Sequence, residues 1–545
     1  MRRGRRKFIL AAVAALVGSP SGAQPQARPP KLLVVISIDQ FSANLFDEYR
    51  PHFTGGLARL ASGTVFRNGF QSHAATETCP GHSTILTGDH PARTGIVNNN
   101  WIDQSISRSD KSVYCAEDET QPGTSSITYK VSPKHLLVPT LGELIKARSP
   151  GSRSVAVSGK DRAAVMMTGH VVDQRWYWNG KTFVTDLEAA PVPQIVPKFR
   201  AVLAAALAQP RPPLESPAFC QGKARPIQVE GGGKTVGSGQ LGRAAGDLAA
   251  FRISPEFDGD TLALAAGLLD EMQLGRRGDT DLLAISLSAT DYVGHTYGPG
   301  GQEMCLQLLE LDRELGDFLQ LLDRRGIDYA VALTADHGGK DIPERERLNG
   351  VPGAARVDRS LSPAAMGKEL TAKLGLKGPG LLGDGASGDM WIDQSLSRAD
   401  RQRLLSAAVA AYRGHPQVEA VFTQSQIAST PIPTGDPVRW SLIERARASY
   451  YPARSGDFFV ILKPNITPIW DTSRSVATHG SVWDYDRRVP IIFWRPGTQG
   501  STVERSAETT DILPTLAAMI GLPLARGSID GHCLPEVPGV SCPAR

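Results

Sequence analysis

Short apolar runs rich in valine and isoleucine recur along the chain, and they constrain its fold more than any other feature. The runs are KLLVVISID (31–39), SVAVSG (154–159), DLLAISLS (281–288), YAVALTAD (329–336), DFFVILK (457–463) and VPIIFW (489–494). Continuous apolar runs of this length are typical of parallel strands that are buried on both faces. Helical patterns at 139–147, 260–273 and 304–325 lie between them. The alternation predicts an α/β fold with a largely parallel central sheet flanked by helices.

Long stretches between these runs are rich in glycine, proline and serine. The stretches near 90–135, 175–255 and 340–450 are too long for plain loops, so we expect insertions that form a cap over the sheet. The chain has 545 residues and 41% hydrophobic content, which is enough for a large core. We therefore expect a single domain over 24–545 that carries these insertions.

The N-terminus resembles a cleavable export signal over 1–23, with cleavage after Ala23. It begins with a cationic segment, continues through an apolar run from Phe8 to Val17 and ends in small residues. This run is too short for a stable membrane anchor, so we expect none. The order RRKFI at 5–9 leaves both the general secretory and the twin-arginine export routes open. The expected location is periplasmic or secreted.

The cysteines form an even set in a chain with an export signal. They are Cys79, Cys115, Cys220, Cys305, Cys533 and Cys542. Because no two of them have Cys-x-x-Cys spacing, disulfides are expected rather than zinc–cysteine sites. Many connectivities are possible, and the sequence does not decide among them. Since short loops close most easily, we favour the pairs 79–115, 220–305 and 533–542.

Charge is nearly balanced, with 59 basic and 55 acidic residues and a formal net charge of +4. Basic residues form no long block outside the N-terminal segment, so we expect no nucleic-acid partner.

Acidic and histidine side chains lie where several of the predicted strands end. They are Asp39, Asp291, His295, Asp336, His337 and His479. Because the carboxyl ends of parallel strands meet at one edge of a sheet, we expect these side chains to converge there. Each residue alone could be a helix cap, a turn residue or a core residue. Together, imidazole and carboxylate ligands favour zinc over magnesium or calcium, so the pattern predicts a pair of zinc ions.

The segment ATETCPGHST (75–84) predicts a helix that begins at Pro80, with Thr78 at its N-terminus. Free backbone N–H groups and the positive end of the helix dipole meet at such a position. This environment suits a bound anion and a hydroxyl group that must ionise, although an ordinary threonine cap is the alternative.

The other histidines do not belong to such a set of potential metal ligands at predicted strand ends, and we expect them to be structural or exposed. They are His52, His73, His82, His90, His135, His170, His415 and His532.

The motifs SID, TETCPGHST, DYVGH, ADHGG and THGS, in this order, resemble those of the alkaline phosphatase superfamily. The threonine in place of a serine, and the segment SGKDRAA, resemble its threonine-nucleophile branch, the secreted PhoK-type zinc alkaline phosphatases. The resemblance covers nearly the whole chain after the signal. It therefore implies one alkaline phosphatase-like catalytic domain over 24–545.

The resemblance also implies a role for each residue of the site. One zinc ion would be held by Asp291, His295 and His479, and a second by Asp39, Asp336, His337 and the nucleophile Thr78. Asn99, Lys160 and Arg162 would contact the phosphate, and Asn99 adjoins two further asparagines that could replace it. A further calcium ion has no support in the sequence.

These features predict an exported zinc-dependent alkaline phosphatase that hydrolyses small phosphate monoesters through a phosphothreonine intermediate. Two cations aimed at a terminal phosphate favour a monoester over a diester. The alternatives are a phosphodiesterase or nucleotide pyrophosphatase of the same superfamily, or a non-catalytic metal-binding envelope protein. A sulfatase is disfavoured because CPGH at 79–82 lacks the Cys-x-Pro-x-Arg arrangement. The preferred ester and the oligomeric state stay open, with a monomer favoured.

Overall fold

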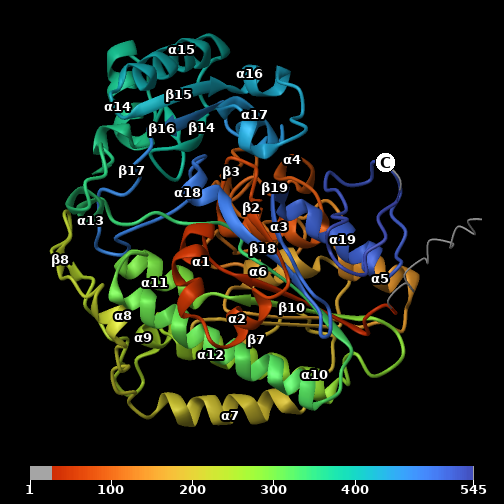
Figure 1. Cartoon of the computed structure of the whole chain (residues 1–545). Coiled ribbons are helices and arrows are strands. Elements are labelled where there is room, and N and C mark those ends of the chain that lie inside the picture. The colour runs from red at the N-terminus through yellow and green to blue at the C-terminus, as the bar shows by residue number, and fades with distance from the viewer. Residues whose placement is uncertain (1–27, 544–545) are drawn as a thin grey trace, which may run out of the picture.

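A nine-stranded sheet forms the centre of the structure, with the strand order β19-β2-β18-β11-β1-β10-β5-β6-β7 (Figure 1). The computed structural model describes residues 28–543, so the predicted export signal at 1–23 lies outside the described residues. The strands of the sheet are β1 Leu32–Ile38, β2 Thr64–Phe70, β5 Ser154–Ser158, β6 Gln174–Trp178, β7 Phe183–Val184, β10 Asp281–Leu287, β11 Tyr329–Thr334, β18 Arg488–Trp494 and β19 Thr502–Glu508.

The middle of this sheet is parallel. Strand β1 pairs in parallel with both β10 and β11, and β5 pairs in parallel with β10 and β6. Ile38 at the end of β1 lies opposite Leu287 at the end of β10, so the carboxyl ends of these neighbours are level. The parallel strands predicted at 31–39, 154–159, 281–288 and 329–336 are therefore confirmed.

Two of the predicted strands differ from their expected placement. The run 489–494 lies in β18, which is antiparallel to both β11 and β2. The run 457–463 forms β16 (Phe458–Leu462), which belongs to a separate four-stranded antiparallel sheet. Both runs are apolar because they are buried, and an apolar run carries no information about strand direction or about which sheet it joins.

Helices cover both faces of the central sheet because side chains of a strand alternate between its faces. On β1, Leu32, Val34 and Ile36 join one core, whereas Leu33 and Val35 join the other. The first core is covered by α1 Ala43–Tyr49, α2 Gly56–Leu60, α7 Ile195–Leu207, α9 Leu248–Arg252, α10 Pro255–Glu271, α11 Ala289–Tyr297 and α12 Gln302–Arg324. The second is covered by α3 Thr78–Thr87, α5 Leu141–Arg148, α6 Asp161–Thr168 and α19 Ile512–Met519. The helices predicted at 139–147, 260–273 and 304–325 correspond to α5, α10 and α12.

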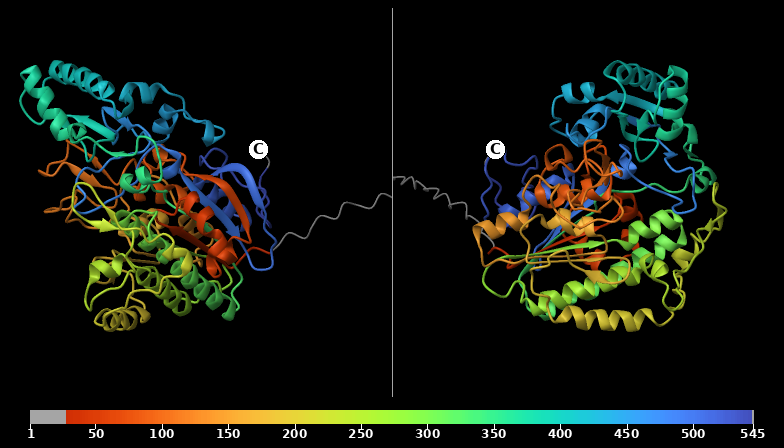
Figure 2. Two further views of the ribbon diagram at one scale, coloured as in Figure 1. Left: turned by 60° about the vertical axis from the view of Figure 1, so that its left-hand side comes forward. Right: turned by 180° about the vertical axis from the view of Figure 1, so that it is seen from behind.

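A smaller unit projects from the core as a separate lobe (Figures 1 and 2). It is built on the sheet β13-β14-β16-β15 and has its own apolar core. Its elements are β13 Leu381–Leu382, β14 Gly388–Ile392, β15 Val418–Thr423, β16, α14 Pro363–Leu374, α15 Arg398–Gly414, α16 Gln424–Ser429 and α17 Leu442–Ser449. Most of this lobe falls within the stretch 340–450.

Shorter elements occupy the remaining loops. They are α4 Pro91–Thr94, β3 Asn100–Ile102, β4 Ser112–Tyr114, α8 Ala218–Gln221, β8 Ile227–Gln228, β9 Thr235–Val236, α13 Pro343–Leu348, β12 Ala355–Arg356, β17 Ile466–Thr467 and α18 Asp484–Arg487. The stretch 90–135 contains α4, β3 and β4. The stretch 175–255 begins inside β6 of the central sheet and continues through α7 to α9.

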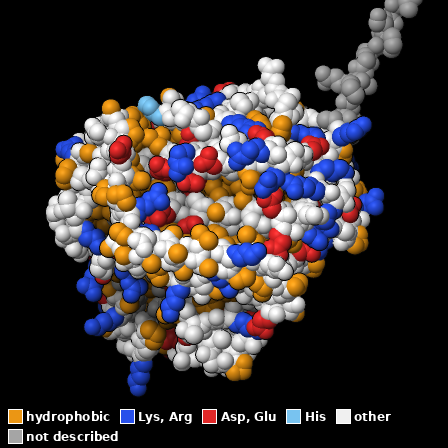
Figure 3. All heavy atoms as spheres, turned by 90° about the horizontal axis from the view of Figure 1, so that it is seen from below, with side chains coloured by type: hydrophobic (Ala, Val, Ile, Leu, Met, Phe, Trp, Pro, Cys, Tyr) orange, Lys and Arg blue, Asp and Glu red, His pale blue; other side chains and the backbone are white. Residues whose placement is uncertain are grey.

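Three disulfides, Cys79–Cys115, Cys220–Cys305 and Cys533–Cys542, link the described cysteines in the favoured order. No helix in the described part of the chain combines the length and the apolar character that a membrane span requires. Acidic and basic side chains are interspersed over the lower face of the molecule (Figure 3), as the balanced charge leads one to expect.

His90, immediately before α4, holds the C-terminal segment to the core. Its Nε2 lies 2.9 Å from Glu508 Oε2 and its Nδ1 lies 3.1 Å from Asp530 Oδ2. Burial alone would lower the pKa of His90, but the hydrogen bonds to Asp530 and Glu508 outweigh it and raise that pKa to about 10. His90 thus has two acidic partners in the fold. The sequence did not indicate them, because they lie more than four hundred residues away along the chain.

This ion pair should make stability depend on pH. Because the folded-state pKa of His90 lies above its ordinary value of 6.5, its contribution is complete below pH 6.5 and is lost as the pH rises through 10. We expect His90→Gln to lower the free energy of unfolding by on the order of a few kcal/mol at pH 6, with a smaller difference at pH 10. Urea unfolding at both pH values measures this. A His415→Gln control should show little effect, and a His90→Gln difference that does not vary with pH would contradict the prediction.

Candidate active site

Polar side chains converge at the carboxyl edge of four adjacent parallel strands. Asp336 and His337 follow β11, and Asp39 follows β1. Asp291 lies in the first turn of α11, which follows β10, and Lys160 is the N-cap of α6, which follows β5. Because the strands are neighbours in the order β11, β1, β10, β5, these side chains are brought side by side.

Thr78 is the first residue of α3, and the whole of this helix is buried. The helix begins two residues before the predicted start, so Pro80 is its third residue. Proline is tolerated there because the N–H groups of the first turn have no acceptor within the helix. Lys160 Nζ and Arg162 Nη2 each lie 3.4 Å from Thr78 Oγ1. The hydroxyl therefore faces two cations at a helix N-terminus.

One group of potential metal ligands consists of Asp291, His295 and His479, whose ligand atoms all lie within 4.8 Å of one another. Asp291 Oδ1 lies 3.2 Å from His295 Nε2 and 3.5 Å from His479 Nε2. The first two residues are one helical turn apart on α11, and His479 comes from the loop that precedes α18.

A second group consists of Asp39, Asp291 and His337, and their ligand atoms also lie within 4.8 Å of one another. His337 Nε2 lies 3.5 Å from Asp39 Oδ1 and 3.3 Å from Asp336 Oδ2. Asp291 is therefore common to both groups, an arrangement that its position in the sequence did not indicate. Lys160 Nζ contacts Asp39 Oδ2 at 2.5 Å and Asp291 Oδ2 at 2.6 Å.

The orientation of the three imidazoles fits a cation between them and the carboxylates. In His295, His337 and His479, Nδ1 lies 2.8 Å from a backbone carbonyl oxygen, which fixes the proton on Nδ1. Each Nε2 then presents a lone pair toward a carboxylate, which is unfavourable unless a positive ion lies between them. Four buried atoms here have no hydrogen-bond partner among the described residues, namely Asp39 Oδ1, Asp291 Oδ1, Asp336 Oδ2 and His337 Nε2. Histidine and carboxylate donors of this kind suit a zinc ion.

Burial and neighbouring charges shift the pKa values of these groups. Burial raises the pKa of Asp39 well above its usual range, and the charge of Asp336 adds to the effect. Burial acts in the same direction on Asp291, but His295 and Lys160 outweigh it and lower the pKa of Asp291. Burial lowers the pKa of His337 to about 3, which keeps its imidazole neutral and able to bind a metal.

Asn99 is the member of the asparagine triplet that lies against α3. Its Oδ1 accepts a hydrogen bond from the backbone N–H of Cys79 at 2.8 Å, and its own N–H donates to Glu77 Oε2 at 2.7 Å. Asn98 instead donates from Nδ2 to Asp389 Oδ2 at 3.0 Å. The amide group of Asn99 is therefore held one residue from Thr78.

His82, which the sequence led us to expect as structural or exposed, lies in this site. It is fully buried, and its Nδ1 lies 3.2 Å from Asp336 Oδ2 while its Nε2 lies 3.0 Å from Ser286 Oγ. The signal that could have found it is its position one helical turn after Thr78 on α3, which places both residues on one face.

Tyr114, at the end of β4, was also not predicted. Its hydroxyl donates to Asp161 Oδ1 at 2.8 Å and accepts from Arg162 Nη1 at 3.4 Å. The adjacent Cys115 is bonded to Cys79, next to Thr78. Cys115 directly follows β4, whose Tyr114 contacts Arg162. The disulfide therefore links the end of β4 to α3, the helix that carries Thr78.

Comparisons with known proteins identify relatives of this chain in sequence and in fold. Residues 33–360 match the family model described as type I phosphodiesterase / nucleotide pyrophosphatase. The chain is 54% identical to alkaline phosphatase PhoK of Sphingomonas sp over 518 residues, which cover 94% of this chain and 92% of that protein. It is 45% identical to alkaline phosphatase PhoD of Zymomonas mobilis subsp. mobilis, over 94% of this chain and 90% of that one. The crystal structure of wild-type alkaline phosphatase PafA superposes with a TM-score of 0.81 at 26% identity, over 95% of this chain and 100% of that one.

Proposed function

The chain belongs to the alkaline phosphatase superfamily, within the type I phosphodiesterase / nucleotide pyrophosphatase family. We propose that this alkaline phosphatase uses Thr78 as its nucleophile and a pair of zinc ions as its cofactor. The observation that carries the proposal is the convergence of two Asp/His groups and two cations on the N-terminus of α3. The resemblance to alkaline phosphatases over nearly the whole chain supports it.

The residues that would hold the zinc ions follow from the donor sets. Asp291, His295 and His479 would bind one ion, and Asp39, Asp336, His337 and Thr78 the other. Because the ligand atom of Asp291 also lies within 4.8 Å of those of Asp39 and His337, Asp291 would contribute to both positions. Bound zinc would lower the pKa of the threonine hydroxyl and stabilise negative charge on the leaving oxygen. The three Nδ1 hydrogen bonds to backbone carbonyls would hold the imidazoles in the ligating orientation.

Thr78 would attack the phosphate in line with the ester bond. A bond forms between Thr78 Oγ1 and phosphorus as the bond from phosphorus to the ester oxygen breaks, and the alcohol leaves with a proton. Water then cleaves the phosphothreonine, which releases inorganic phosphate and restores the hydroxyl. Lys160, Arg162 and the amide of Asn99 would bind the non-bridging oxygens, Arg162 in a bidentate manner. Tyr114 and Asp161 would keep the guanidinium group in place.

The three disulfides are consistent with a location outside the cytoplasm, and we propose that the enzyme is exported to the periplasm or the medium. A phosphodiesterase is the second candidate function, because the matching family model bears that description.

The two cations at Thr78 provide a test between monoester and diester hydrolysis. A terminal phosphate carries one more negative charge than a diester, so Lys160 and Arg162 should stabilise it more. Each charge-assisted hydrogen bond contributes on the order of 1.5–3 kcal/mol, or about one to two powers of ten in rate. We expect the double variant Lys160→Ala/Arg162→Ala to depress kcat/KM for 4-nitrophenyl phosphate far more than for bis(4-nitrophenyl) phosphate.

The matched control is Lys181→Ala/Lys198→Ala, which removes two exposed cations and should leave both activities near those of the wild type. An equal loss of both activities in the Lys160/Arg162 variant would assign these residues a general structural role and remove this support for a monoesterase.

A further inference from the structure

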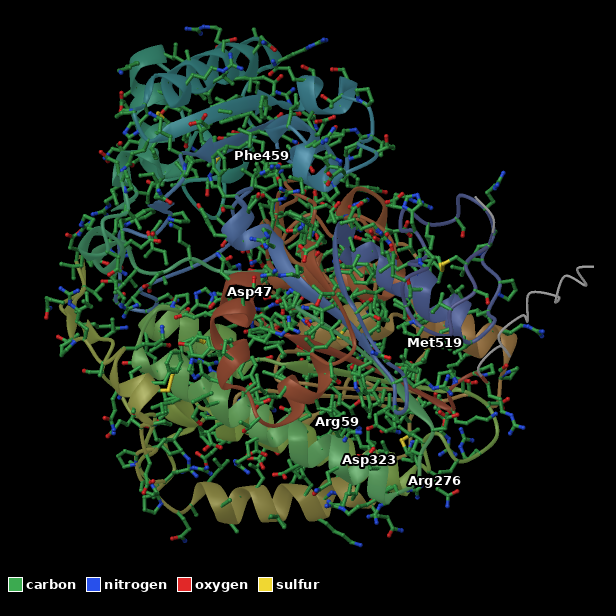
Figure 4. The ribbon with its side chains drawn as sticks, in the orientation of Figure 1. Asp47, Arg59, Arg276, Asp323, Phe459 and Met519 are labelled. Carbon is green, nitrogen blue, oxygen red and sulfur yellow. A yellow bond between two sulfur atoms is a disulfide. The ribbon has the colours of Figure 1, made fainter. Side chains whose placement is uncertain are left out.

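A cavity of about 210 Å³ lies beside the proposed catalytic centre, between the core and the small lobe. Its wall includes Glu77, immediately before Thr78, and His479 of the first ligand group. The lobe contributes Asp389 and Trp391 from β14 and Phe459 from β16. Figure 4 labels Phe459 at the side of the lobe that faces the core. A group that leaves the catalytic centre on the His479 side would enter this cavity.

The cavity wall is acidic. It carries the carboxylates of Glu77, Asp384 and Asp389 and no lysine or arginine. Among the residues that the structure describes, Glu77 and Asp389 accept hydrogen bonds only from amide groups, those of Asn99, Asn98 and Gly456. Asp384 is exposed, and within the described residues 28–543 no hydrogen bond or ion pair reaches its carboxylate. The negative charge of this wall is therefore not balanced by the protein.

The same wall has an aromatic part, formed by Trp391 and Phe459. Aromatic faces together with carboxylates stabilise organic ammonium groups, through the ring quadrupole and through charge attraction. A metal ion fits less well. Within the described part of the chain, the groups whose ligand atoms converge within 4.8 Å are the two at the catalytic centre, and neither contains a carboxylate of this wall.

We propose that this cavity receives the leaving alcohol and selects phosphate monoesters whose alcohol carries an ammonium group. The inference rests on the proposed function, in which Thr78 attacks phosphorus in line. Because Thr78 would ligate the ion held by Asp39, Asp336 and His337, in-line attack would direct the leaving oxygen toward the other ligand group, Asp291, His295 and His479. An ester with a second anionic group on its alcohol is disfavoured by the same carboxylates.

Phosphocholine and 3,3-dimethylbutyl phosphate provide the test, because they have the same shape and differ in the cationic nitrogen. The quantity measured is the ratio of their kcat/KM values at pH 9, in the full-length wild-type enzyme and in Asp384→Asn. Comparing the ratio between the two proteins cancels the different reactivities of the two alcohols. We expect the ratio to fall about three- to ten-fold in the variant, as expected for one carboxylate near an ammonium group at a partly solvated site.

Glu419→Gln is the matched control, because it removes an exposed carboxylate on β15 of the same lobe, outside the cavity wall. Its ratio should equal that of the wild type. An unchanged ratio in Asp384→Asn, or an equal fall in Glu419→Gln, would overturn the proposal. Failure of the proposed function is distinguishable from both outcomes, because the wild type would then hydrolyse neither ester and would also fail with 4-nitrophenyl phosphate.

Discussion

Thr78→Ala is expected to reduce the hydrolysis of phosphate monoesters by at least about a thousand-fold while leaving the fold intact. The covalent step needs an oxygen at the N-terminus of α3, and alanine has none. The fold should tolerate this change, because among the described residues the Thr78 hydroxyl has hydrogen bonds only with Lys160 and Arg162, each at 3.4 Å. Steady-state hydrolysis of 4-nitrophenyl phosphate measures the loss. Acid quenching of the wild type followed by mass spectrometry should locate a phosphate on Thr78.

Two variants make this result interpretable. Thr78→Ser keeps the hydroxyl and should retain measurable activity. Thr76→Ala removes a neighbouring hydroxyl that donates to the Ser481 carbonyl oxygen at 2.8 Å, and it should lower activity far less than Thr78→Ala. Activity near that of the wild type in Thr78→Ala, with the phosphate found on Thr76, would move the nucleophile to that residue.

Asp291→Ala should have the second large effect, because this carboxylate belongs to both ligand groups. We expect the variant to lose most of its bound zinc at both positions and most of its activity. His479→Ala should lose one ion selectively, since His479 belongs to one group only and a zinc site with too few protein ligands binds weakly. Zinc per chain after dialysis, measured by plasma mass spectrometry, distinguishes the two patterns.

The control for metal content is His532→Ala, which removes an exposed imidazole outside the site. It should keep the metal content of the wild type. If Asp291→Ala and His479→Ala lost the same amount of zinc, Asp291 would not serve both ions. If neither variant lost zinc, the ligand assignment as a whole would be wrong.

Local pattern was enough to predict the central strands and the residues that follow them. The runs that end at Asp39 and Asp336 are apolar because their strands are buried on both faces. Such continuous apolar composition can be recognised in the sequence without knowing the fold. The carboxyl edge of a parallel sheet then concentrates whatever polar residues follow, which is why Asp291 could be expected near them. The favoured disulfide pairs are confirmed, and each joins two cysteines that are neighbours in the order of the sequence.

Contacts between distant segments could not be predicted in this way. The direction of β18 and the membership of β16 in a second sheet depend on pairing partners far along the chain, and both strands have the same apolar composition whichever partner they choose. His90 differs in role from the exposed histidines only through Asp530 and Glu508, which the sequence places more than four hundred residues away. The acidic cavity likewise requires the lobe to lie against the catalytic centre.

Periodicity and composition report the environment of each segment, so they identified the strands and the polar residues at their ends. Tertiary packing decides which of those residues meet and which side chains line the space between them. The reason is that packing brings together distant segments, and the sequence of one segment does not indicate which other segment it will contact.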